Sequence, residues 1–426
     1  MMELKKIENK RLGEVCFEGK HSSGLKIRLY PKEGYVSAFA MFGTRYGSVD
    51  TKFKRSDEAD YTEVPEGIAH FLEHKLFESE DGDAFTRYAA TGASANAFTS
   101  FDATCYLFSC SENFKESFEI LLDFVQKPYF TARTVEKEQG IIGQEIKMYD
   151  DSPQWRVFFN MLGALYHKHP VRIDIAGTEE SIAKIDADLL YRCYHTFYNL
   201  NNMALTVVGK FDMDEVLALC DKLLKPAPDV TVDSVFVDEP EDIFKKRVEQ
   251  RFPIAVPLFN MGFKETAGRE PKTPAQLAAT DILLECIASD HSELYRRLLD
   301  AGLINDTFGS EYFKGPGYAA VVFAGESVDP DEVFREILRE VETLRQKGVN
   351  RKAFERAKKA VYARKAAAFD NMENIAHGLI EAAFDGYQIY DIMEAVASCT
   401  YEDVCARMKE QLCSERAVLS VVLPLK

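Results

Sequence analysis

The 426-residue sequence contains no apolar stretch long enough to cross a lipid bilayer. A membrane-spanning helix needs roughly 18 or more consecutive apolar residues, and charged residues interrupt every candidate stretch well before that length. The N-terminal segment MMELKKIENKRLGEVCFEG is charged, but no apolar segment of the kind that secretory signals carry follows it. We therefore expect a soluble protein with a cytoplasmic location and no membrane contact.

The sequence is also poor in the features of disulfide-bonded, nucleic-acid-binding and nucleotide-hydrolysing proteins. Its nine cysteines form no CxxC pair and leave an odd one over, which favours reduced, mostly buried thiols over disulfides. The net charge of −17 argues against a nucleic-acid surface, and the single Trp155 offers no platform for stacking bases. No GxxxxGKS or GxxxxGKT segment is present, so phosphate-loop chemistry is not indicated.

The chain does contain enough residues for two domains. A length of 426 residues exceeds one ordinary core and predicts two domains of roughly 200 residues each. The polar, proline-bearing passage KPAPDVTVDSVFVDEPED interrupts the periodic segments near the middle of the chain. We predict a first domain over residues 1–225, a linker over 226–242 and a second domain over 243–426.

Both halves predict an α+β fold. In the first half we expect strands in SGLKIRLYP, SAFAMFGTRYGS and NMALTVVGKF, and a helix in SENFKESFEILLDFVQKP. The second half repeats this order coarsely, with strands in VPLFNMGFKE, GYAAVVFAGES and RAVLSVVLP and helices in PAQLAATDILLECIAS and residues 330–383. A duplicated domain explains the repetition economically, and two unrelated α+β domains are the alternative.

The segment GIAHFLEHKLFE places His70 and His74 four residues apart, with Glu73 directly before the second histidine. Its apolar spacing and the preceding Pro65 indicate a helix, so the two imidazoles project from one face, about 5–6 Å apart at the β-carbon. Imidazoles are typical zinc ligands, and a catalytic zinc needs a third protein ligand. A neighbouring carboxylate such as Glu73 can take a proton from the activated water. An amphipathic helix that carries two histidines by accident is the alternative.

A second helical segment, TVEKEQGIIGQEIKMY, carries Glu138 and Glu145 seven residues apart and therefore near one another on one face. One carboxylate can bind the ion and the other can support it. Ordinary solvated charge is the alternative for both, and it is the expectation for Glu136.

Together these segments resemble the insulinase/pitrilysin family of metallopeptidases. His70-Phe71-Leu72-Glu73-His74 has the form of the inverted zinc motif HxxEH. The segments GASANAFTSFDATCYLF, HPVRIDIAGTEESI and YHTFYNLNNMALTVVGKFD resemble further parts of the family pattern. The resemblance is closest to half-length bacterial members of the YmfH type and extends to subunits of the mitochondrial processing peptidase. It implies two related α+β domains, each a mainly antiparallel sheet with helices packed on one face.

The resemblance also implies a role for each residue of the predicted site. His70, His74 and Glu145 correspond to the ligands of one zinc ion per chain. Glu73 corresponds to the general base, and Glu138 to a residue that supports the ligands without touching the ion.

Residues 92–104 are expected to bind the substrate. Small side chains at Gly92 to Ala95 and at Ala97 leave the backbone approachable, and an exposed strand edge can pair with an extended peptide. We predict that Asn96, Ala97 and Thr99 bind the substrate; the family residue that matches Asn96 hydrogen-bonds the peptide backbone. A core strand with small residues for close packing is the alternative.

The second half departs from the family pattern in SELYRRLLDAGLINDTFG. Active members have an arginine where Leu299 stands and a tyrosine where Asn305 stands. Substitution by Arg296 or Arg297 is the alternative, although either side chain would point roughly 200–300° away from the required direction around the helix axis. The resemblance implies that half-length members need a second subunit to enclose the substrate. We therefore predict a heterodimer with a zinc-less paralogue, or a homodimer when the chain is isolated.

We predict a zinc-dependent endopeptidase that cleaves peptides or unfolded segments bound as an added edge strand. A non-catalytic peptide-binding or scaffold subunit of a peptidase complex is the alternative. His167 and His169 form an HxH pattern, for which we expect a structural role.

Overall fold

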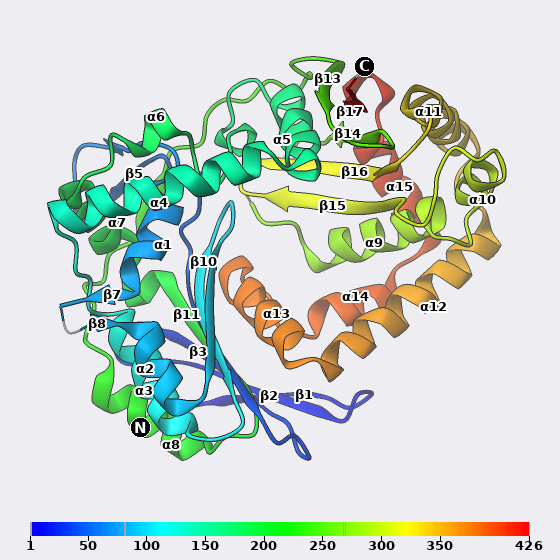
Figure 1. Ribbon diagram of the computed structural model, residues 1–426. Helices are drawn as coiled ribbons and strands as arrows, with labels where there is room; N and C mark the ends of the chain where they lie inside the picture. The colour runs from blue at the N-terminus through cyan, green and yellow to red at the C-terminus, as the bar shows by residue number, and fades with distance from the viewer. Residues whose placement is uncertain (1, 81, 267, 269, 426) are drawn as a thin grey trace. The chain divides into compact units, whose positions relative to one another are not determined.

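The structure is a computed structural model that describes residues 2–80, 82–266, 268 and 270–425. The chain forms two compact units, each built around its own β-sheet (Figure 1). The first unit consists of Met1–Ile146, Asp174–Val235 and Ala367–Ile389. The second consists of Lys147–Ile173, Phe236–Ala366 and Tyr390–Lys426.

The first unit contains a mostly antiparallel sheet of seven strands. Across the sheet they are β1 (Lys5–Asn9), β2 (Glu14–Lys20), β3 (Lys26–Pro31), β11 (Met203–Gly209), β4 (Ala38–Thr44), β10 (Thr104–Cys110) and β9 (Ser94–Thr99). Neighbouring strands are antiparallel, except that β3 and β11 are parallel. All residues of β4 and β11 are buried, as expected for central strands covered on both faces.

Helices cover both faces of this sheet. Figure 1 shows α1 (Ile68–Leu76), α2 (Ala84–Thr91) and α3 (Phe114–Phe124) on one side and α13 (Met372–Asp385) on the other. Adjacent residues of β9 reflect this arrangement, because neighbours in a strand point to opposite faces. The Thr99 hydroxyl bonds to Glu73 of α1, whereas the Phe98 ring lies 5.1 Å from the ring of His377 in α13.

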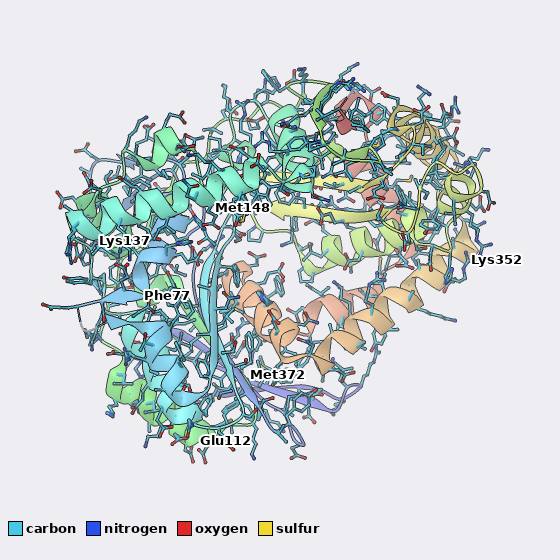
Figure 2. All side chains as sticks on the ribbon, viewed as in Figure 1. Phe77, Glu112, Lys137, Met148, Lys352 and Met372 are labelled. Atoms are coloured by element: carbon cyan, nitrogen blue, oxygen red, sulfur yellow. The ribbon has the colours of Figure 1, made fainter. Side chains whose placement is uncertain are left out.

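An aromatic cluster fixes α1 against α2 and α3. Phe77, labelled in Figure 2, directly follows α1. Its ring stacks on Phe85 of α2, with centroids 4.3 Å apart, and on Phe124 of α3 at 5.2 Å. Such pairs contribute about 0.5–1.5 kcal/mol each beyond their buried area, so the cluster holds the C-terminal end of the motif helix in place.

Further elements of the first unit surround this framework. They are β12 (Val232–Ser234), β5 (Lys52–Arg55), β6 (Thr62–Glu63), β7 (Glu78–Ser79), β8 (Gly82–Asp83), α6 (Glu179–Ile182), α7 (Ala187–Phe197) and α8 (Met213–Leu223). The long helix α4 (Ala132–Asp150) begins in this unit.

The second unit contains a five-stranded sheet. Its strands are, in order, β13 (Arg247–Phe252), β17 (Ala417–Pro424), β14 (Leu258–Lys264), β16 (Tyr318–Glu326) and β15 (Gly309–Gly315). Again neighbours are antiparallel, except for the parallel pair β13 and β17. The helices are α5 (Pro153–Leu165), α9 (Pro274–Ala288), α10 (Glu293–Asp300), α11 (Pro330–Lys347), α12 (Arg351–Ala367), α14 (Asp391–Ser398) and α15 (Tyr401–Gln411).

The two sheets have the same topology. The order β3-β11-β4-β10-β9 in the first unit matches β13-β17-β14-β16-β15 in the second, with parallel and antiparallel pairs in the same places. In both units two helices follow the second of these strands along the chain, α1 and α2 after β4, and α9 and α10 after β14. The predicted pair of related α+β domains is confirmed, except that helices cover both faces of the first sheet where the prediction placed them on one face. Helix α9 and strand β15 are the counterparts of α1 and β9.

The two halves of the chain exchange one helix each. Helix α5 lies in the first half of the sequence but packs on β14 and β17 of the second unit. Helix α13 lies in the second half but packs on β4 and β11, the equivalent strands of the first unit. The units also change at Val235, inside the predicted linker. The domain boundaries at 225 and 243 stay a prediction, because the compact units interleave along the chain.

Basic residues of β3 help to attach α13 to its sheet. Lys26 donates to the Ala383 carbonyl at 2.8 Å, and Arg28 donates to the carbonyls of Leu379 and Tyr387. The Ala383 carbonyl is one of the last four of α13, which have no partner within the helix and carry the negative end of its dipole. Two cations at this place therefore stabilise the exchanged helix.

Glu239, which lies in the predicted linker, anchors the loop of the HxH pattern. Its carboxylate accepts hydrogen bonds from the backbone amides of His167, Lys168 and His169, at 2.7 to 2.9 Å. The Lys264 ammonium donates to the same carboxylate at 2.7 Å. Linker residues around Glu239 are therefore a packed part of the second unit.

The predicted structural role of His169 is confirmed. Its Nδ1 accepts a hydrogen bond from the Val171 amide, and its Nε2 donates to the Pro316 carbonyl at 3.0 Å. Burial lowers the pKa of His169 to about 4, so the ring is neutral at pH 7. Both nitrogens are used by the backbone, which leaves neither for a metal ion.

Replacing Glu239 with glutamine should destabilise the second unit in a pH-dependent way. Burial raises the pKa of Glu239, but Lys264 and the three amides outweigh it and lower the pKa from 4.5 to about 2. A carboxylate whose pKa falls on folding stabilises the fold above its unfolded pKa and loses this contribution as the pH drops to the folded pKa. We expect Glu239→Gln to lower the free energy of unfolding by about 2 kcal/mol at pH 7.

Urea unfolding followed by Trp155 fluorescence measures this effect, since the only tryptophan lies in α5 of the second unit. The difference between Glu239→Gln and the wild type should shrink between pH 4.5 and about pH 2. Glu241→Gln, at an exposed position in the same segment, is the matched control. Equal differences at pH 7 and at the acid end would contradict the assigned ion pair.

Candidate metal and catalytic site

The motif helix α1 begins at a position that only glycine fits. Gly67 has a φ of +87°, and a β-carbon there would lie 2.4 Å from the Ala176 carbonyl oxygen. From this start the helix is buried along nearly its whole length, including Phe71 and Leu72 at its centre. The apolar residues hold α1 against the sheet, so the directions of His70 and His74 are set by packing.

The two histidines and Glu145 converge as predicted. The imidazole rings of His70 and His74 have centroids 4.6 Å apart. Nε2 of His70 lies 3.8 Å from one oxygen of Glu145, and Nε2 of His74 lies 3.5 Å from the other. One ligand atom from each of the three residues lies within 4.8 Å of the other two.

This donor set fits a zinc ion. Two donor atoms that each lie about 2.1 Å from a tetrahedral ion are roughly 3.4 Å apart, close to the 3.5 and 3.8 Å between the imidazole nitrogens and Glu145. Two imidazoles and one carboxylate also leave a fourth position open, as in catalytic zinc sites. In the described part of the chain, this is the one group of three such residues with metal-binding geometry.

Glu138 supports His74 from the other side. It lies on the buried face of α4, in line with Val135 and Ile142, and its carboxylate accepts from Nδ1 of His74 at 3.1 Å. This bond places the ring proton on Nδ1 and turns the Nε2 lone pair toward Glu145, the arrangement typical of metal-bound histidines. Burial raises the pKa of Glu138, but the bond to His74 outweighs burial and keeps that pKa low.

The electrostatics of the cluster favour a cation. Burial, and then the neighbouring His74, lower the pKa of His70 to about 4, so its imidazole is neutral and available as a ligand. Burial also lowers the pKa of His74, but Glu138, Glu73 and Glu145 outweigh it and raise that pKa. Three carboxylates around one imidazole thus stabilise positive charge at this place.

Glu73 lies beside the metal cluster and is not one of its three members. Its side chain is buried, and one carboxylate oxygen accepts a hydrogen bond from the Thr99 hydroxyl at 2.7 Å. Burial raises the pKa of Glu73, and the opposing effects of Thr99 and His74 do not cancel this. A pKa nearer neutrality suits a general base.

The predicted substrate residues lie on β9, at the edge of the seven-stranded sheet. Among the described strands, β9 pairs with β10 alone. Because side chains alternate along a strand, Thr99 and Ala97 face α1, whereas the exposed Asn96 points to the opposite face. The Asn96 side chain accepts from the Ala97 amide at 2.9 Å. The structure therefore brings Thr99 to the cluster and leaves Asn96 away from Glu73.

The departure from the family pattern lies in the second unit, around α10. Leu299 is exposed, and the Asn305 side chain bonds to Thr307 in its own loop and to Glu326 at the end of β16. Arg297 forms ion pairs with two residues of α11, from Nε to Glu336 at 3.2 Å and from Nη2 to Glu340 at 2.8 Å. Arg297 is therefore already engaged in a local ion-pair network.

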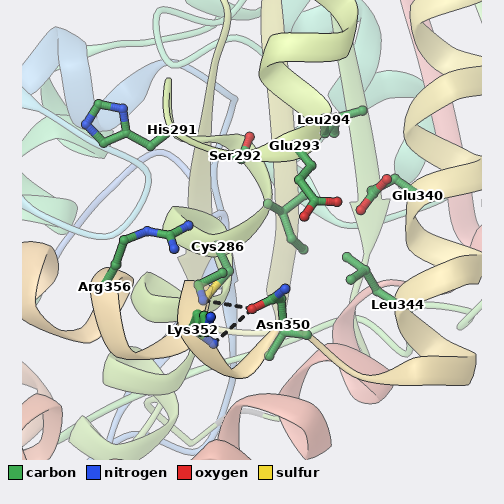
Figure 3. Close-up of a pocket in the computed structure, with 13 residues that line it drawn as sticks. Cys286, His291, Ser292, Glu293, Leu294, Glu340, Leu344, Asn350, Lys352 and Arg356 are labelled. Atoms are coloured by element: carbon green, nitrogen blue, oxygen red, sulfur yellow. Dashed lines mark hydrogen bonds between the residues drawn. The ribbon is translucent and has the colours of Figure 1, made fainter.

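A cavity of about 150 Å³ lies beside the same helices (Figure 3). Glu293, Glu340 and Arg356 contribute to its wall, and Asn350 caps the start of α12 by accepting from two backbone amides. None of the predicted site residues lines this cavity. The cavity is therefore separate from the predicted metal site.

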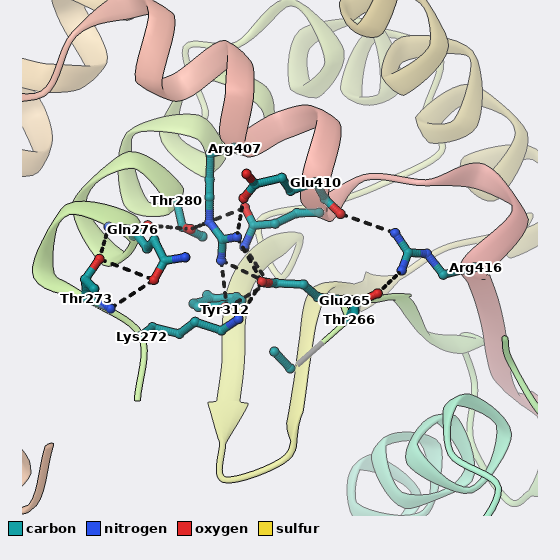
Figure 4. A network of polar contacts seen from close by, with 12 residues as sticks. Glu265, Thr266, Lys272, Thr273, Gln276, Thr280, Tyr312, Arg407, Glu410 and Arg416 are labelled. Atoms are coloured by element: carbon teal, nitrogen blue, oxygen red, sulfur yellow. Dashed lines mark hydrogen bonds and ion pairs between the residues drawn. The ribbon is translucent and has the colours of Figure 1, made fainter. Parts of the chain in front are cut away.

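The second unit has a buried ion pair that contacts α9 and β15, the counterparts of α1 and β9. Arg407 of α15 binds both oxygens of Glu265, at 2.8 and 2.9 Å, and also contacts Thr280 of α9 and Tyr312 of β15 (Figure 4). Removing one partner of such a pair typically costs 3–5 kcal/mol. Through this network α9, the counterpart of α1, is bound to α15 and β15.

One residue of the motif helix was not singled out by its sequence pattern. Lys75 is fully buried next to His74, and its ammonium pairs with Glu78. Lys137 of α4, labelled in Figure 2, lies 3.7 Å from the same carboxylate. A lysine in a buried helix, with a glutamate three residues later, is the signal that indicates this pair.

Two protein-family profiles match this chain. The profile of "Insulinase (Peptidase family M16)" matches residues 59–179, and that of "Peptidase M16 inactive domain" matches residues 184–361. YmfH of Bacillus subtilis, described as an uncharacterized zinc protease, is 38% identical over 99% of both chains. No helix in the described residues is long and apolar enough to span a membrane.

Solved structures show the same fold. An M16-like peptidase from Alicyclobacillus acidocaldarius is 34% identical, with a TM-score of 0.92 over 100% of this chain and 99% of that one. The periplasmic protease PqqL of Escherichia coli, at 17% identity, shares the fold with a TM-score of 0.74 over 98% of this chain and 48% of its own. With its full-length similarity to YmfH and its HxxEH helix, this chain belongs to the insulinase family of peptidases, family M16.

Proposed function

We propose that this chain is the metal-bearing subunit of a zinc endopeptidase that cleaves peptides or unfolded segments. The observation that carries the proposal is the convergence of His70, His74 and Glu145 on one point. Glu73 adds a buried carboxylate that stands beside these donors without being one of them. A metal site with a separate base can hydrolyse an amide by activating water.

Each residue then has a distinct task. A zinc ion held by His70, His74 and Glu145 would polarise the scissile carbonyl and lower the pKa of a bound water to about 7. Glu73 accepts the proton of the attacking water and later delivers it to the nitrogen of the leaving amine. Glu138 keeps His74 in the tautomer that presents Nε2.

The free edge of β9 is the proposed binding place for the substrate. An extended peptide would pair with the main chain of β9, near Asn96 and Ala97, as an added antiparallel or parallel strand. Main-chain pairing requires an unfolded segment and reads little of its sequence. Peptides and unfolded segments are therefore the proposed substrate class.

We further propose that the active form contains a second subunit of the same family. The chain spans about half the length of PqqL, and Leu299 and Asn305 replace the arginine and tyrosine expected in the second domain. A zinc-less paralogue would supply these groups, and a homodimer is the form expected of the isolated chain. The cytoplasmic location remains part of this proposal.

A non-catalytic subunit that only binds peptides is the second candidate. The match of residues 184–361 to an inactive-domain profile favours it for that part of the chain. The complete donor set in the first unit, with Glu73 in place, favours catalysis.

Metal analysis and a peptidase assay test the proposal. The purified chain should contain about one zinc per chain, and His70→Ala should lose it, whereas His291→Ala, at an exposed and distant sequence position, should not. Cleavage of a mixed peptide library should be weak for the chain alone and rise with a co-expressed paralogue that has no HxxEH motif. A purified chain without zinc would contradict the proposed enzymatic function. So would a zinc-loaded chain that has no activity together with its co-expressed paralogue.

A further inference from the structure

We infer that Thr99 is a positioning residue for Glu73, acting through its hydroxyl and not through contact with the peptide. This inference rests on the proposed function and deepens it. It revises the expectation that Thr99 binds the substrate, and it assigns to the last residue of β9 a part in the proton transfer.

The hydrogen bond between the two side chains is short and enclosed. Thr99 Oγ1 donates to Glu73 Oε2 at 2.7 Å, and the Glu73 carboxylate is buried. A hydroxyl that donates to a carboxylate makes a charge-assisted bond, which is about twice as strong as one between neutral groups. The bond therefore restrains the rotation of the Glu73 carboxylate.

The place of Thr99 on the strand supports this role. The side chain faces α1, whereas a peptide added to the edge of β9 would use the backbone N–H and C=O groups that point outward in the plane of the sheet. Thr99 can therefore hold Glu73 while its strand binds a substrate. The hydroxyl and the peptide do not compete for the same space.

The surroundings of Thr99 are themselves held firmly. Thr104, directly opposite in the register of β10, has its hydroxyl 3.4 Å from that of Thr99 and 2.9 Å from the Tyr46 carbonyl, to which it donates. The turn that follows Thr99 is bound to the loop after β4 by two backbone bonds, Ser48 to Ser100 and Val49 to Phe101. A rigid donor is what a positioning role demands.

The bond has a specific consequence for catalysis. Glu73 is next to the ligand His74 in the sequence, so a freely rotating carboxylate could turn toward the metal cluster and act as a further ligand. With Oε2 held by Thr99, the carboxylate is kept beside the cluster as a base. Loss of the hydroxyl should therefore reduce turnover more than it reduces peptide binding.

Thr99→Val tests the inference, because valine keeps the shape of the side chain and removes only the donor. In the zinc-loaded enzyme, with its partner subunit where one is needed, we expect kcat to fall by roughly 10–100-fold with KM nearly unchanged. Thr99→Ser retains the hydroxyl and should restore most of kcat. Thr206→Val is the matched control, because the buried Thr206 hydroxyl on β11 has no hydrogen-bond partner among the described residues.

A binding measurement separates positioning from contact. A fluorescein-labelled peptide that the wild type cleaves should bind equally well to Glu73→Gln and to the double variant Glu73→Gln/Thr99→Val. Zinc content should remain about one per chain in every variant, and thermal melting should show that each is folded. Thr99→Ala replaces Thr99→Val if valine prevents folding.

The outcomes distinguish the inference from the function on which it rests. Normal kcat in Thr99→Val, with an active wild type, would overturn the inference alone. Equal losses of kcat in the serine and valine variants, or weaker peptide binding by the double variant, would return Thr99 to a structural or substrate-contact role. A zinc-loaded wild type that cleaves nothing with its partner would overturn the proposed function and this inference together.

Discussion

Replacing Glu73 with glutamine should lower peptide hydrolysis by roughly 10²-fold or more, while the fold and the zinc content persist. Glutamine has the size of glutamate and keeps an oxygen that can accept from Thr99, so the packing around α1 is preserved. It cannot take up a proton at neutral pH, so the step that activates water is lost. The measurement is the cleavage rate of a fluorogenic peptide, with zinc determined on the same sample.

Glu66→Gln provides a control for this variant, since Glu66 precedes α1 and its side chain is not part of the cluster. It should retain the wild-type rate. Turnover near the wild-type level in Glu73→Gln would contradict the assignment of Glu73 as the base, whatever the zinc content.

Replacing Glu145 with glutamine should cause the largest loss of zinc affinity among the carboxylate variants. Glu145 offers one oxygen to each histidine, at 3.8 and 3.5 Å, and it is the anionic member of the donor set. An amide oxygen is a weaker and neutral ligand, so two imidazoles would hold the ion almost alone. Competition with a fluorescent chelator measures the affinity directly.

Variants of two further glutamates of α4 test this prediction by the size of their effect on zinc binding. Glu138→Gln should cost about 10–100-fold in zinc affinity or activity, because Glu138 acts only through Nδ1 of His74. Glu136→Gln, at an exposed position of the same helix, should have no effect. A larger loss in Glu136→Gln than in Glu145→Gln would mean that the proposed ligand set is wrong.

Much of this site could be predicted from local sequence patterns. The four-residue spacing of His70 and His74 places both imidazoles on one helix face, because helix geometry depends only on the backbone. The apolar periodicity around them predicted α1, and alternating or continuous apolar segments predicted β4, β11, β14, β16 and β17. The repeated order of strands and helices likewise predicted two related sheets, which share one topology.

Other features depended on which segments pack together. The sequence favoured Glu138 and Glu145 equally as neighbours on one face, and a resemblance was needed to give them different roles. In the structure, Glu138 meets Nδ1 of His74 across 64 residues of sequence, while Glu145 meets the two Nε2 atoms. Helix periodicity shows which side chains point in the same direction, but it does not show which atom each of them will contact.

The sequence by itself determined the α+β class, the motif helix and the shared direction of His70 and His74, because these follow from periodicity and spacing along the chain. The family resemblance added the edge position of β9 and the different roles of Glu138 and Glu145. Only the tertiary structure decided that Thr99 holds Glu73 and that α5 and α13 each pack on the sheet of the other half. These are contacts between segments far apart in sequence. They are selected by the burial of complementary apolar surfaces and by the pairing of buried polar groups, and the spacing of residues within one segment does not show which distant segment it will contact.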